Sequence, residues 1–486
     1  MSRNLTMMTD FYQLTMMYGY MREDMMDKRA VFDLFYRRTS DSSAYAVAAG
    51  LEQLIEYINN LHFEEGDVAY LRSLKCFDED FLQYLLTMRF DGDIYAVPEG
   101  TLVFPNEPII RVEAPIIQAQ LIETALLNII NHQTLIATKA SRVVQAAQGD
   151  LVMEFGLRRA QGPDAGIYGA RAAIIGGCRG TSNVLTGEMF DVAVKGTHAH
   201  SWVMSFPNEV DAFRAYAKVY PSACLLLVDT YDTLKSGIPN AITVFKELRE
   251  QGYEPMGIRL DSGDLAYLSI QARKTLDDAG FPNATITASN DLDEYIIWEL
   301  KAQGAKINAW GVGTRLITSN DNPALGGVYK MSAEIDGGVL IPKMKISENP
   351  GKMTNPGKKK LLRIYGSDGM ALADLICLHD EVIDLNRSLT IFDPVNTWKS
   401  MTLQGGQYSI KELLMPVFID GKQVYTSPTL SEISEFAAKE LNTFWTQYKR
   451  ISKPHVYKVD LSTKLYRLRE DMLRESVHTV IPEMQP

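Results

Sequence analysis

Hydrophobic and polar positions in the middle of the chain follow a repeating order of short apolar runs and longer amphipathic stretches. Each apolar run is followed by a polar turn, and most turns by a stretch with helical periodicity. A buried strand followed by a helix, repeated about every 30 residues, is typical of a parallel sheet, either a barrel or a doubly wound sheet. The predicted strands are 151–155, 192–194, 224–228, 256–260, 285–288 and 309–312, and the predicted helices are 241–251, 266–279 and 292–303.

Both ends of the chain show a different pattern. Short alternating runs punctuated by Gly and Pro fill residues 91–112, and similar runs at 328–335 and 339–345 follow Gly326, which indicates antiparallel strands. We therefore predict one α+β domain built from residues 1–112 and 325–486, and an α/β catalytic domain at residues 113–324. Further predicted elements are a strand at 30–37 and helices at 5–20 with Thr9 as N-cap, 46–61, 115–147 with a break near 131–133, 430–448 and 461–475.

Composition narrows the class of protein. The 486 residues are 46% hydrophobic and 22% charged, as in an ordinary globular protein of one to three domains. The net charge of -11 argues against a nucleic-acid binder, although a local basic pocket for a phosphorylated small molecule stays open. The N-terminus has no apolar segment and the chain has no apolar run long enough for a membrane helix, so we expect a cytoplasmic protein. The four widely spaced cysteines favour neither disulfides nor zinc.

Polar residues gather where the predicted strands end, which is where an α/β barrel holds its chemistry. The segment 151–203 carries three such patches, at 154–159 (EFGLRR), 180–183 (GTSN) and 196–202 (GTHAHSW). A lone histidine such as His200 is more often structural, but its setting, at a strand end opposite acidic residues, favours a functional role. Taken alone, His198, Phe155 and Tyr12 would be interpreted as core or surface residues.

Two later strands end in acidic residues. Helix N-capping explains Asp232 and Asp264 as well as a functional role does. Asp261 lies two residues after Arg259 at a strand end, where capping explains less. Two carboxylates at neighbouring strand ends suit a Mg²⁺ ion that bridges a polyphosphate.

The last predicted strand runs into a Gly-x-Gly-Thr turn formed by residues 311–314. Alone this turn is weak evidence. At the last strands of a barrel it suits a phosphate site built from backbone N–H groups and a helix N-terminus.

In combination, these motifs resemble those of the nicotinate phosphoribosyltransferases, which belong with the type II phosphoribosyltransferases. The resemblance runs in family order from Thr9 to about Lys359, and the last hundred or so residues add little to it. It implies an irregular TIM-like α/β barrel beside a domain built from both chain ends, and a homodimer with its active sites at the subunit interface. The matching pieces are 9–16 (TDFYQLTM), 155–161 (FGLRRAQ), 180–183, 196–201, 228–232 (VDTYD), 259–264 (RLDSGD) and 311–314 (GVGT).

The resemblance also implies a reaction. Nicotinate displaces pyrophosphate from phosphoribosyl pyrophosphate to give nicotinate mononucleotide, the first step of NAD salvage from nicotinate. ATP is a co-substrate whose hydrolysis is coupled through a phosphorylated histidine, and Mg²⁺ is the expected cofactor.

Individual roles follow from the same resemblance. His200 matches the phosphorylated histidine, whereas His198 falls on a variable position. Asp261 is the expected Mg²⁺ ligand and, with His200 and Arg259, forms the expected catalytic set. The nicotinamide-using relatives carry an aspartate where this chain has Ser182, so Ser182 is expected to favour nicotinate. The expected substrate-binding residues are Tyr12 from the other subunit, Phe155, Arg158, Ser182, Thr197, Asp229, Gly311, Gly313 and Thr314.

Two alternatives stay open. The first is the sibling enzyme that acts on nicotinamide. The second is a phosphosugar-binding or regulatory protein without catalysis, which is disfavoured because a binder has no need of His200 beside the Mg²⁺ acids.

Overall fold

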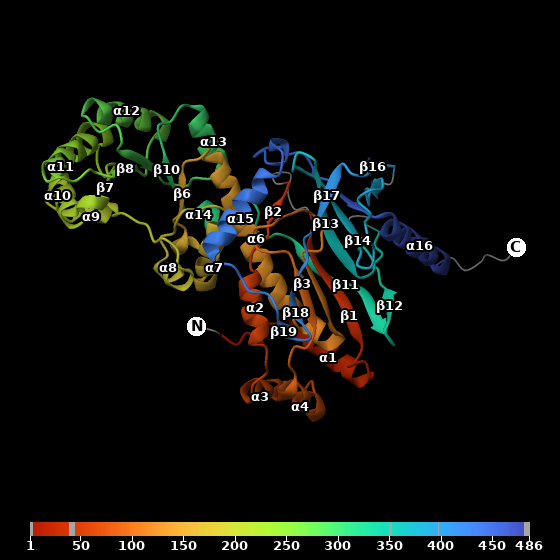
Figure 1. Cartoon of the computed structure of the whole chain (residues 1–486). Coiled ribbons are helices and arrows are strands. Elements are labelled where there is room, and N and C mark those ends of the chain that lie inside the picture. The colour runs from red at the N-terminus through yellow and green to blue at the C-terminus, as the bar shows by residue number, and fades with distance from the viewer. Residues whose placement is uncertain (1–2, 38–43, 349–351, 397, 481–486) are drawn as a thin grey trace. The chain divides into compact units, whose positions relative to one another are not determined.

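The computed structural model describes residues 3–37, 44–348, 352–396 and 398–480 (Figure 1). Its chain divides into two compact units. Unit 1 consists of Met1–Thr134, Ala324–Thr429 and Phe436–Pro486, and unit 2 of Leu135–Pro323 and Leu430–Glu435. Unit 1 is thus assembled from both ends of the chain, and the first division between the units falls inside helix α6 (Glu123–Ala146).

The larger sheet of unit 1 joins the two ends of the chain. Its interior strand β1 pairs antiparallel with β5 from the N-terminal segment and with β11 from the C-terminal one. All but one of the residues of β1 are buried, because the strand is covered on both faces. The sheet order is β12-β11-β1-β5-β3-β18-β19, with bounds β1 Arg29–Tyr36, β3 Asp93–Ala96, β5 Ile110–Pro115, β11 Gly327–Asp336, β12 Val339–Pro342, β18 Met415–Ile419 and β19 Lys422–Gln423.

A second sheet of unit 1 is formed within the C-terminal segment. Its core is a cluster of aliphatic side chains on β13 and β14, including Leu362, Ile364 and Leu375. Its order is β16-β15-β20-β14-β13-β17, with bounds β13 Lys359–Gly366, β14 Ala371–Leu378, β15 Leu389–Phe392, β16 Ser400–Leu403, β17 Tyr408–Glu412 and β20 Val459–Leu461; β2 Ala46–Val47 and β4 Leu102–Val103 form a separate pair. The helices of this unit are α1 Phe11–Arg22, α2 Leu51–Asn59, α3 Glu65–Ser73, α4 Glu79–Thr87, α5 Ile116–Leu121 and α16 Thr463–Val480, with parts of α6 and of α15 Leu430–Asn442.

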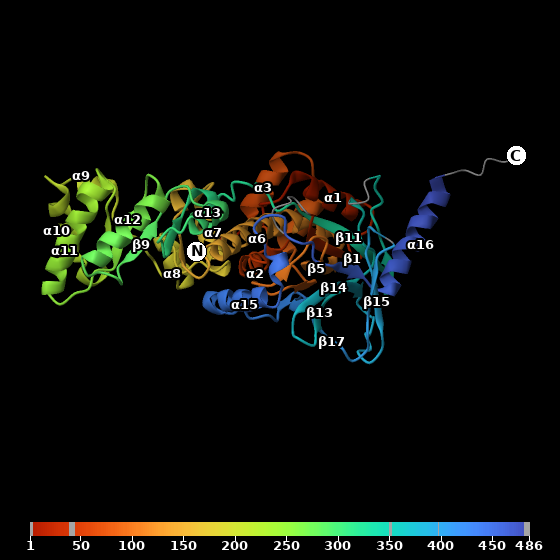
Figure 2. The same ribbon diagram turned by 90° about the horizontal axis from the view of Figure 1, so that it is seen from above.

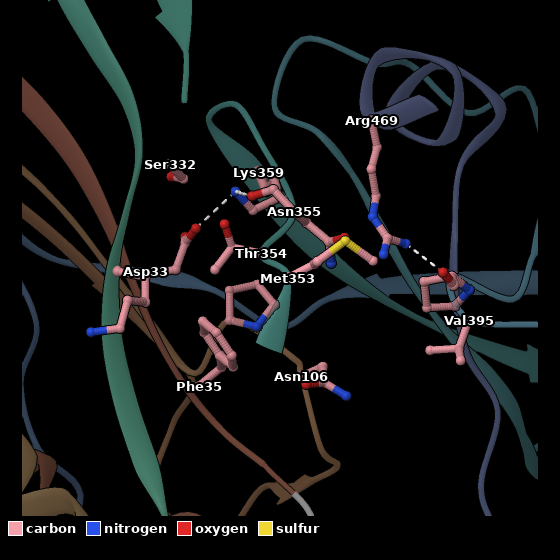
Figure 3. Close-up of a pocket in the computed structure, with 13 residues that line it drawn as sticks. Asp33, Phe35, Asn106, Ser332, Met353, Thr354, Asn355, Lys359, Val395 and Arg469 are labelled. Carbon is pink, nitrogen blue, oxygen red and sulfur yellow. Dashed lines mark hydrogen bonds and ion pairs between the residues drawn. The ribbon is translucent and has the colours of Figure 1, made fainter. Parts of the chain in front are cut away.

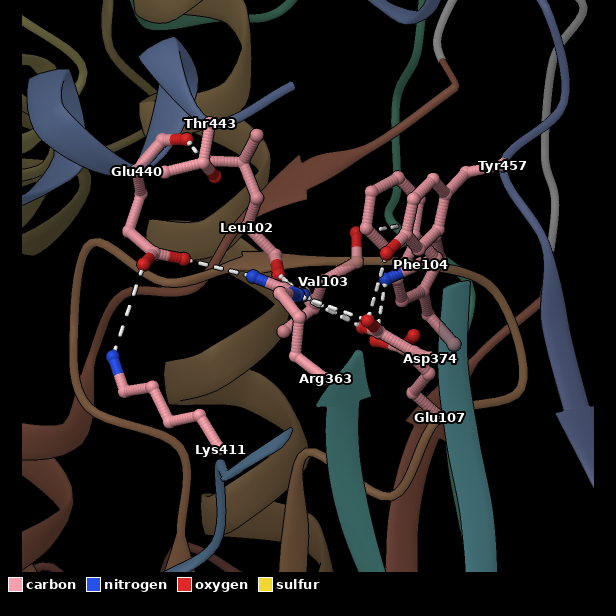
Figure 4. Close-up of polar contacts among 11 residues, drawn as sticks. Leu102, Val103, Phe104, Glu107, Arg363, Asp374, Lys411, Glu440, Thr443 and Tyr457 are labelled. Atoms are coloured by element: carbon pink, nitrogen blue, oxygen red, sulfur yellow. Dashed lines mark hydrogen bonds and ion pairs between the residues drawn. The ribbon is translucent and has the colours of Figure 1, made fainter. Parts of the chain in front are cut away.

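A buried ion cluster fastens this second sheet to the rest of unit 1 (Figure 4). Arg363 is fully buried and lies 2.7 Å from Asp374 and 2.8 Å from Glu440. Its guanidinium also donates to the Leu102 carbonyl, and the Tyr457 hydroxyl donates to Asp374. A buried charge is tolerated only when it is paired and hydrogen-bonded, and Arg363 meets both conditions.

Unit 2 is built on a parallel sheet whose strands end at one edge. Helix α11 connects β7 to β8, and helix α12 connects β8 to β9 and contacts both of these strands (Figures 1 and 2). The order is β6-β10-β9-β8-β7, with bounds β6 Leu151–Glu154, β7 Leu225–Leu227, β8 Gly257–Leu260, β9 Thr285–Ala288 and β10 Ala309–Val312. Its helices are α7 Pro163–Ile175, α8 Val184–Phe190, α9 His200–Met204, α10 Glu209–Val219, α11 Ile238–Glu250, α12 Leu265–Asp278, α13 Glu294–Ala302 and α14 Thr314–Ile317.

Five of the six predicted parallel strands are confirmed. At the sixth, 192–194, the structure has only an isolated bridge between Val194 and Thr181, and a second isolated bridge joins Thr181 to Glu154. Within the described residues no ladder joins Val194 to β7, so the sheet is open where a barrel would close. A side-chain contact lies at this opening, since the Leu227 N–H donates to His198 Nε2 at 3.3 Å.

Several helix boundaries differ from the prediction, including that of α15, which ends at Asn442 rather than at 448 and is followed by a separate 3₁₀ turn at Thr446–Tyr448. Helix α1 begins at Phe11 with Asp10, not Thr9, at the N-cap position, and Thr9 instead donates to the Leu121 carbonyl. Residues 46–50 are not helical, because α2 starts only after Gly50, whose φ of 107° suits glycine. The helical region from 115 onward breaks at Ile122, between α5 and α6, and not near 131–133.

The described parts of the chain contain no helix that is both long and apolar enough to span a membrane.

Candidate active site

A pocket opens at the carboxyl edge of the parallel sheet in unit 2. It encloses about 570 Å³, part of it open to solvent, and its walls come from the segments that follow β6, β8, β9 and β10. Three arginines and two aspartates line it, so the lining carries a net positive charge in a chain whose net charge is -11. The lining residues are Phe155, Arg158, Arg159, Arg259, Asp261, Ser289, Asn290, Asp291, Gly311, Gly313 and Thr314.

Arg259 and Asp261 form the polar centre of the pocket. Arg259 Nη2 donates to Asp261 Oδ1 at 2.9 Å, and Arg259 Nη1 donates to Thr197 Oγ1 at 3.1 Å. Arg259 Nε donates to Ser289 Oγ at 2.8 Å. The predicted residues Arg259, Asp261 and Thr197 are therefore brought together.

Asp229 supports this centre from the end of the neighbouring strand. Its Oδ2 accepts the Asp261 N–H at 2.8 Å and the Ser262 hydroxyl at 2.6 Å. Its Oδ1 is buried and has no hydrogen-bond partner among the described residues. Asp229 thus fixes the backbone of Asp261 and retains one carboxylate oxygen that is not engaged.

The two histidines of the segment 196–202 lie in different surroundings. His200 Nδ1 lies 3.1 Å from Thr230 Oγ1, and its Nε2 lies 3.7 Å from Asp261 Oδ2. His198 is buried and accepts the Leu227 N–H with Nε2. Burial lowers the pKa of His198 to about 4, so this ring stays neutral. His200 is thus the histidine next to the polar centre, and His198 is a structural residue.

Phe155 lies against the last strand of the sheet. A Cβ atom at Gly311 would come within 2.6 Å of the Phe155 ring, and one at Gly313 within 3.1 Å of the Phe155 carbonyl. The absence of a side chain at Gly311 is therefore what allows the ring to sit over β10. Just before it, the buried Glu154 accepts from the Thr181 hydroxyl at 2.6 Å and from the Gly156 N–H, and burial raises the pKa of Glu154.

Thr197, Asp229 and His200 contact residues that line the pocket without lining it themselves, whereas neither Ser182 nor Tyr12 forms a hydrogen bond or ion pair with a lining side chain within the described residues. Ser182 is half-buried, and its N–H donates to the Glu154 carbonyl at 3.0 Å. The turn beside it is capped by Thr181, whose hydroxyl oxygen accepts the Asn183 N–H, and not by Ser182. Tyr12 belongs to unit 1, where its side chain on α1 is 49% exposed.

Comparison with known proteins places the chain in a family. Three family models match: the nicotinate phosphoribosyltransferase N-terminal domain at residues 7–131, the family model at 151–368 and the C-terminal domain at 358–469. The chain belongs to the nicotinate phosphoribosyltransferase family. A nicotinate phosphoribosyltransferase of Bacillus subtilis is 47% identical over 99% of this chain and 98% of its own length. The Homo sapiens protein of that name is 33% identical, with 95% of each chain covered.

Solved structures of relatives agree with this family and its fold. The crystal structure of human nicotinic acid phosphoribosyltransferase matches with a TM-score of 0.84 and 31% identity, covering 96% of this chain and 99% of that one. A nicotinate-nucleotide pyrophosphorylase from Pyrococcus furiosus shares the fold, with a TM-score of 0.68 and 22% identity over 90% of this chain and 94% of its own.

Four pocket residues of this family member were missed by the sequence reasoning. Arg159 follows Arg158 in a short 3₁₀ turn, and Ser289, Asn290 and Asp291 follow β9 directly. The signal was present, because a polar Ser-Asn-Asp run after a predicted strand meets the same criterion that selected Asp261. Asn290 and Asp291 have φ values of 90° and 42°, a left-handed turn that only the structure reveals.

Two acidic residues have structural roles in this family member. Asp232 accepts the N–H groups of Leu234 and Lys235, and Asp264 accepts that of Tyr267 at the start of α12. The capping interpretation is confirmed for both. Among the described residues no group of three or more His, Cys, Asp or Glu side chains is arranged to hold a metal.

A second cavity lies in unit 1 between β1, β11 and the segment before β13 (Figure 3). A buried ion pair crosses it, with Lys359 Nζ 2.8 Å from Asp33 Oδ2, and burial lowers the pKa of Lys359. The same ammonium donates to the carbonyls of Asn355 and Gly357. Since this lysine is fully hydrogen-bonded, it serves to hold the segment before β13 against the sheet.

Proposed function

We propose that this protein is an ATP-coupled nicotinate phosphoribosyltransferase. It converts nicotinate, phosphoribosyl pyrophosphate, ATP and water to nicotinate mononucleotide, pyrophosphate, ADP and phosphate, the first step of NAD salvage from nicotinate. The full-length similarity to a protein of that name supports the reaction. The observation that carries it is the placement of Asp261 Oδ1 at 2.9 Å from Arg259 and of Asp261 Oδ2 at 3.7 Å from His200.

The transfer step needs positioning and electrostatics more than acid–base chemistry. The pyridine nitrogen forms a bond to the anomeric carbon of the ribose while the bond from that carbon to a pyrophosphate oxygen breaks. Positive charge builds on the ribose and negative charge on the pyrophosphate, so fixed cations near the leaving group stabilise the transition state. Arg259 and Arg158 have the planar fork that matches phosphate and carboxylate oxygens.

Mg²⁺ fits the residues at this site. It usually takes one or two protein carboxylates together with substrate phosphates and water. Asp261 Oδ2 accepts no hydrogen bond from the described residues, and Asp229 Oδ1 is a buried oxygen without a partner. We assign Asp261 as the ligand of a bound Mg²⁺, which would neutralise charge on the pyrophosphate, and the free oxygen of Asp229 supports the same site.

We assign the ATP coupling to His200. Its Nδ1 is held by Thr230, which leaves Nε2 to attack the γ-phosphorus of ATP. The N–P bond forms as the bond to ADP breaks, and water later cleaves the N–P bond to release phosphate. His198 is unsuited to this step, because its Nε2 is engaged inside the protein.

Nicotinate would stack on Phe155, with Tyr12 of a second subunit on the other face of the ring. Arg158 is exposed at the pocket wall and can meet the carboxylate. Gly311, Gly313 and Thr314 line the same pocket and are assigned to the 5′-phosphate, together with the start of α14. These assignments make the active protein a homodimer with shared sites.

We also infer that the open parallel sheet of unit 2 is an irregular version of a TIM-like barrel and that the protein acts in the cytoplasm. Five parallel strands extended by two single bridges support the first inference. The four cysteines are all free thiols, as is usual in a reducing compartment, which supports the second.

Product identification tests the proposal. The purified protein is incubated with phosphoribosyl pyrophosphate, MgCl₂ and either nicotinate or nicotinamide, each with and without ATP, and the products are separated by chromatography. Nicotinate mononucleotide with stoichiometric ADP is the expected result. A product formed from nicotinamide alone would establish the sibling activity, and no product from either ring would favour a binding protein.

A further inference from the structure

We propose that Ser289 is a positioning residue that orients Asp261 and Arg259 together and, through them, the pyrophosphate group of the substrate. The inference deepens the proposed function and rests on it. Ser289 is the first residue after β9, and its side chain is 4% exposed.

The hydroxyl of Ser289 closes a triangle of hydrogen bonds. It accepts from Arg259 Nε at 2.8 Å and donates its single proton to Asp261 Oδ1. Arg259 Nη2 donates to the same Asp261 oxygen at 2.9 Å. A hydroxyl both donates and accepts, so one atom of Ser289 satisfies a cation on one side and an anion on the other.

The triangle determines which carboxylate oxygen of Asp261 stays free. Oδ1 accepts from both Ser289 and Arg259, which fixes the rotation of the carboxylate. Oδ2 is then directed toward His200, 3.7 Å away, and is the oxygen left for a cation or a substrate group. Without the Ser289 hydroxyl, only Arg259 would hold Oδ1, and the carboxylate could rotate.

The same triangle determines which N–H groups of Arg259 remain available. A guanidinium has five donors in a fixed plane. Ser289, Thr197 and Asp261 take one each, at Nε, Nη1 and Nη2. The remaining donor on each terminal nitrogen is thereby left for phosphate oxygens in the pocket, and removal of Ser289 would release the Nε end of the fork.

Backbone geometry holds Ser289 in place. The two residues that follow, Asn290 and Asp291, have φ values of 90° and 42°, so the chain turns sharply after the serine. On the strand side, a Cβ atom built at Gly311 would lie 3.5 Å from Ser289 Cβ. Gly311 thus lets β10 approach the serine, and because Ser289 is only 4% exposed, its hydroxyl has little access to bulk water as an alternative partner.

The test compares Ser289→Ala with the matched pair Ser289→Thr and Ser289→Val, which share a shape but differ in the hydroxyl. Calorimetry measures the binding of pyrophosphate in MgCl₂, and steady-state kinetics measures the KM of each substrate. Loss of a hydrogen bond to a charged group predicts about 10- to 100-fold weaker pyrophosphate binding in Ser289→Ala, and weaker binding in Ser289→Val than in Ser289→Thr. The KM for phosphoribosyl pyrophosphate should rise while that for nicotinate stays near the wild-type value.

Ser269→Ala is the control, since Ser269 is a buried serine of α12 that hydrogen-bonds to Ala266 and Lys306 and does not line this pocket. Wild-type pyrophosphate affinity in Ser289→Ala, or an equal loss in Ser269→Ala, would overturn the inference. Because pyrophosphate binding is measured without turnover, this outcome is distinguishable from failure of the proposed reaction, which would show as a wild-type protein that makes no nicotinate mononucleotide.

Discussion

At the residue scale, the two histidines of the segment 196–202 predict opposite results in a labelling experiment. After incubation with ATP labelled at the γ-phosphate, His200→Ala should lose the acid-labile label, because its Nε2 faces the polar centre. His198→Ala should keep it, since His198 is a neutral structural ring whose pKa burial lowers to about 4. Label that survives in His200→Ala and disappears in His198→Ala would reverse the assignment.

Ser182 gives a second prediction at this scale. Its side chain makes no hydrogen bond among the described residues, and Thr181 caps the adjacent turn, so capping does not account for the serine. A carboxylate introduced there would repel the nicotinate carboxylate, and like-charge contacts of this kind cost several kcal/mol. Ser182→Asp should therefore lower kcat/KM for nicotinate about 100-fold or more, and should narrow the gap to nicotinamide.

Steady-state kinetics of Ser182→Asp and Ser182→Ala with both substrates checks this prediction. The alanine variant is the matched control, because it removes the hydroxyl without adding charge. If the ratio of nicotinate to nicotinamide activity were unchanged in a folded Ser182→Asp protein, Ser182 would have no part in the discrimination.

At the element scale, the buried cluster that joins β13, β14 and α15 predicts a pH dependence of stability. Glu107 is fully buried within this cluster, and burial together with the nearby Asp374 raises its pKa well above 4.5 (Figure 4). Its Oε2 accepts the Phe104 N–H, whereas its Oε1 has no partner among the described residues. A proton on Glu107 would supply a donor toward Asp374.

The direction of this pH dependence follows from the linkage between protonation of Glu107 and folding. The unfolded chain releases this proton near its ordinary pKa, so the stabilising contribution of Glu107 is full below about pH 4.5 and is lost as the pH rises toward the folded pKa. Glu107→Gln keeps an uncharged donor at all pH values. Its free energy of unfolding relative to wild type should thus rise between pH 5 and 8, by at most about 1.4 kcal/mol per pH unit. Urea unfolding at several pH values measures it, with the exposed Glu23→Gln as control, and a pH-independent difference would contradict the prediction.

Helices and strands were predictable from the sequence where their residues follow a single pattern of hydrophobic and polar positions. Strands such as β9 (285–288) and β10 (309–312) match their predicted bounds, because both are short apolar runs closed by polar turns. The break at Ile122 was not predictable, since nothing in the local sequence breaks the helical pattern there. The candidate site likewise contains residues whose roles were predictable and residues whose roles were not. Arg259 and Asp261 were predicted from their strand end, whereas the positioning role of Ser289 is recognised only once the hydrogen bonds that join the ends of β8 and β9 are known.

At the scale of the whole molecule, the proposed homodimer should show complementation between subunits. Tyr12 lies on α1 of unit 1 and is half exposed, while Phe155 and His200 belong to unit 2. The pKa of Tyr12 is raised by burial and by Glu123 and Asp10, so the phenol stays neutral and suited to stacking on an aromatic ring. If Tyr12 completes the site of a second subunit, Tyr12→Ala and His200→Ala remove two different parts of the same site.

Mixing the two inactive variants under subunit exchange checks this expectation. Each mixed dimer would contain one site with both substitutions and one intact site. With random exchange of equal amounts, half of the dimers are mixed and half of their sites are intact, so about one quarter of the wild-type activity should return. Exchange is verified by mass spectrometry with one variant isotopically labelled, and each variant mixed with itself serves as the control. No recovery despite complete exchange would mean that Tyr12 serves the site of its own chain.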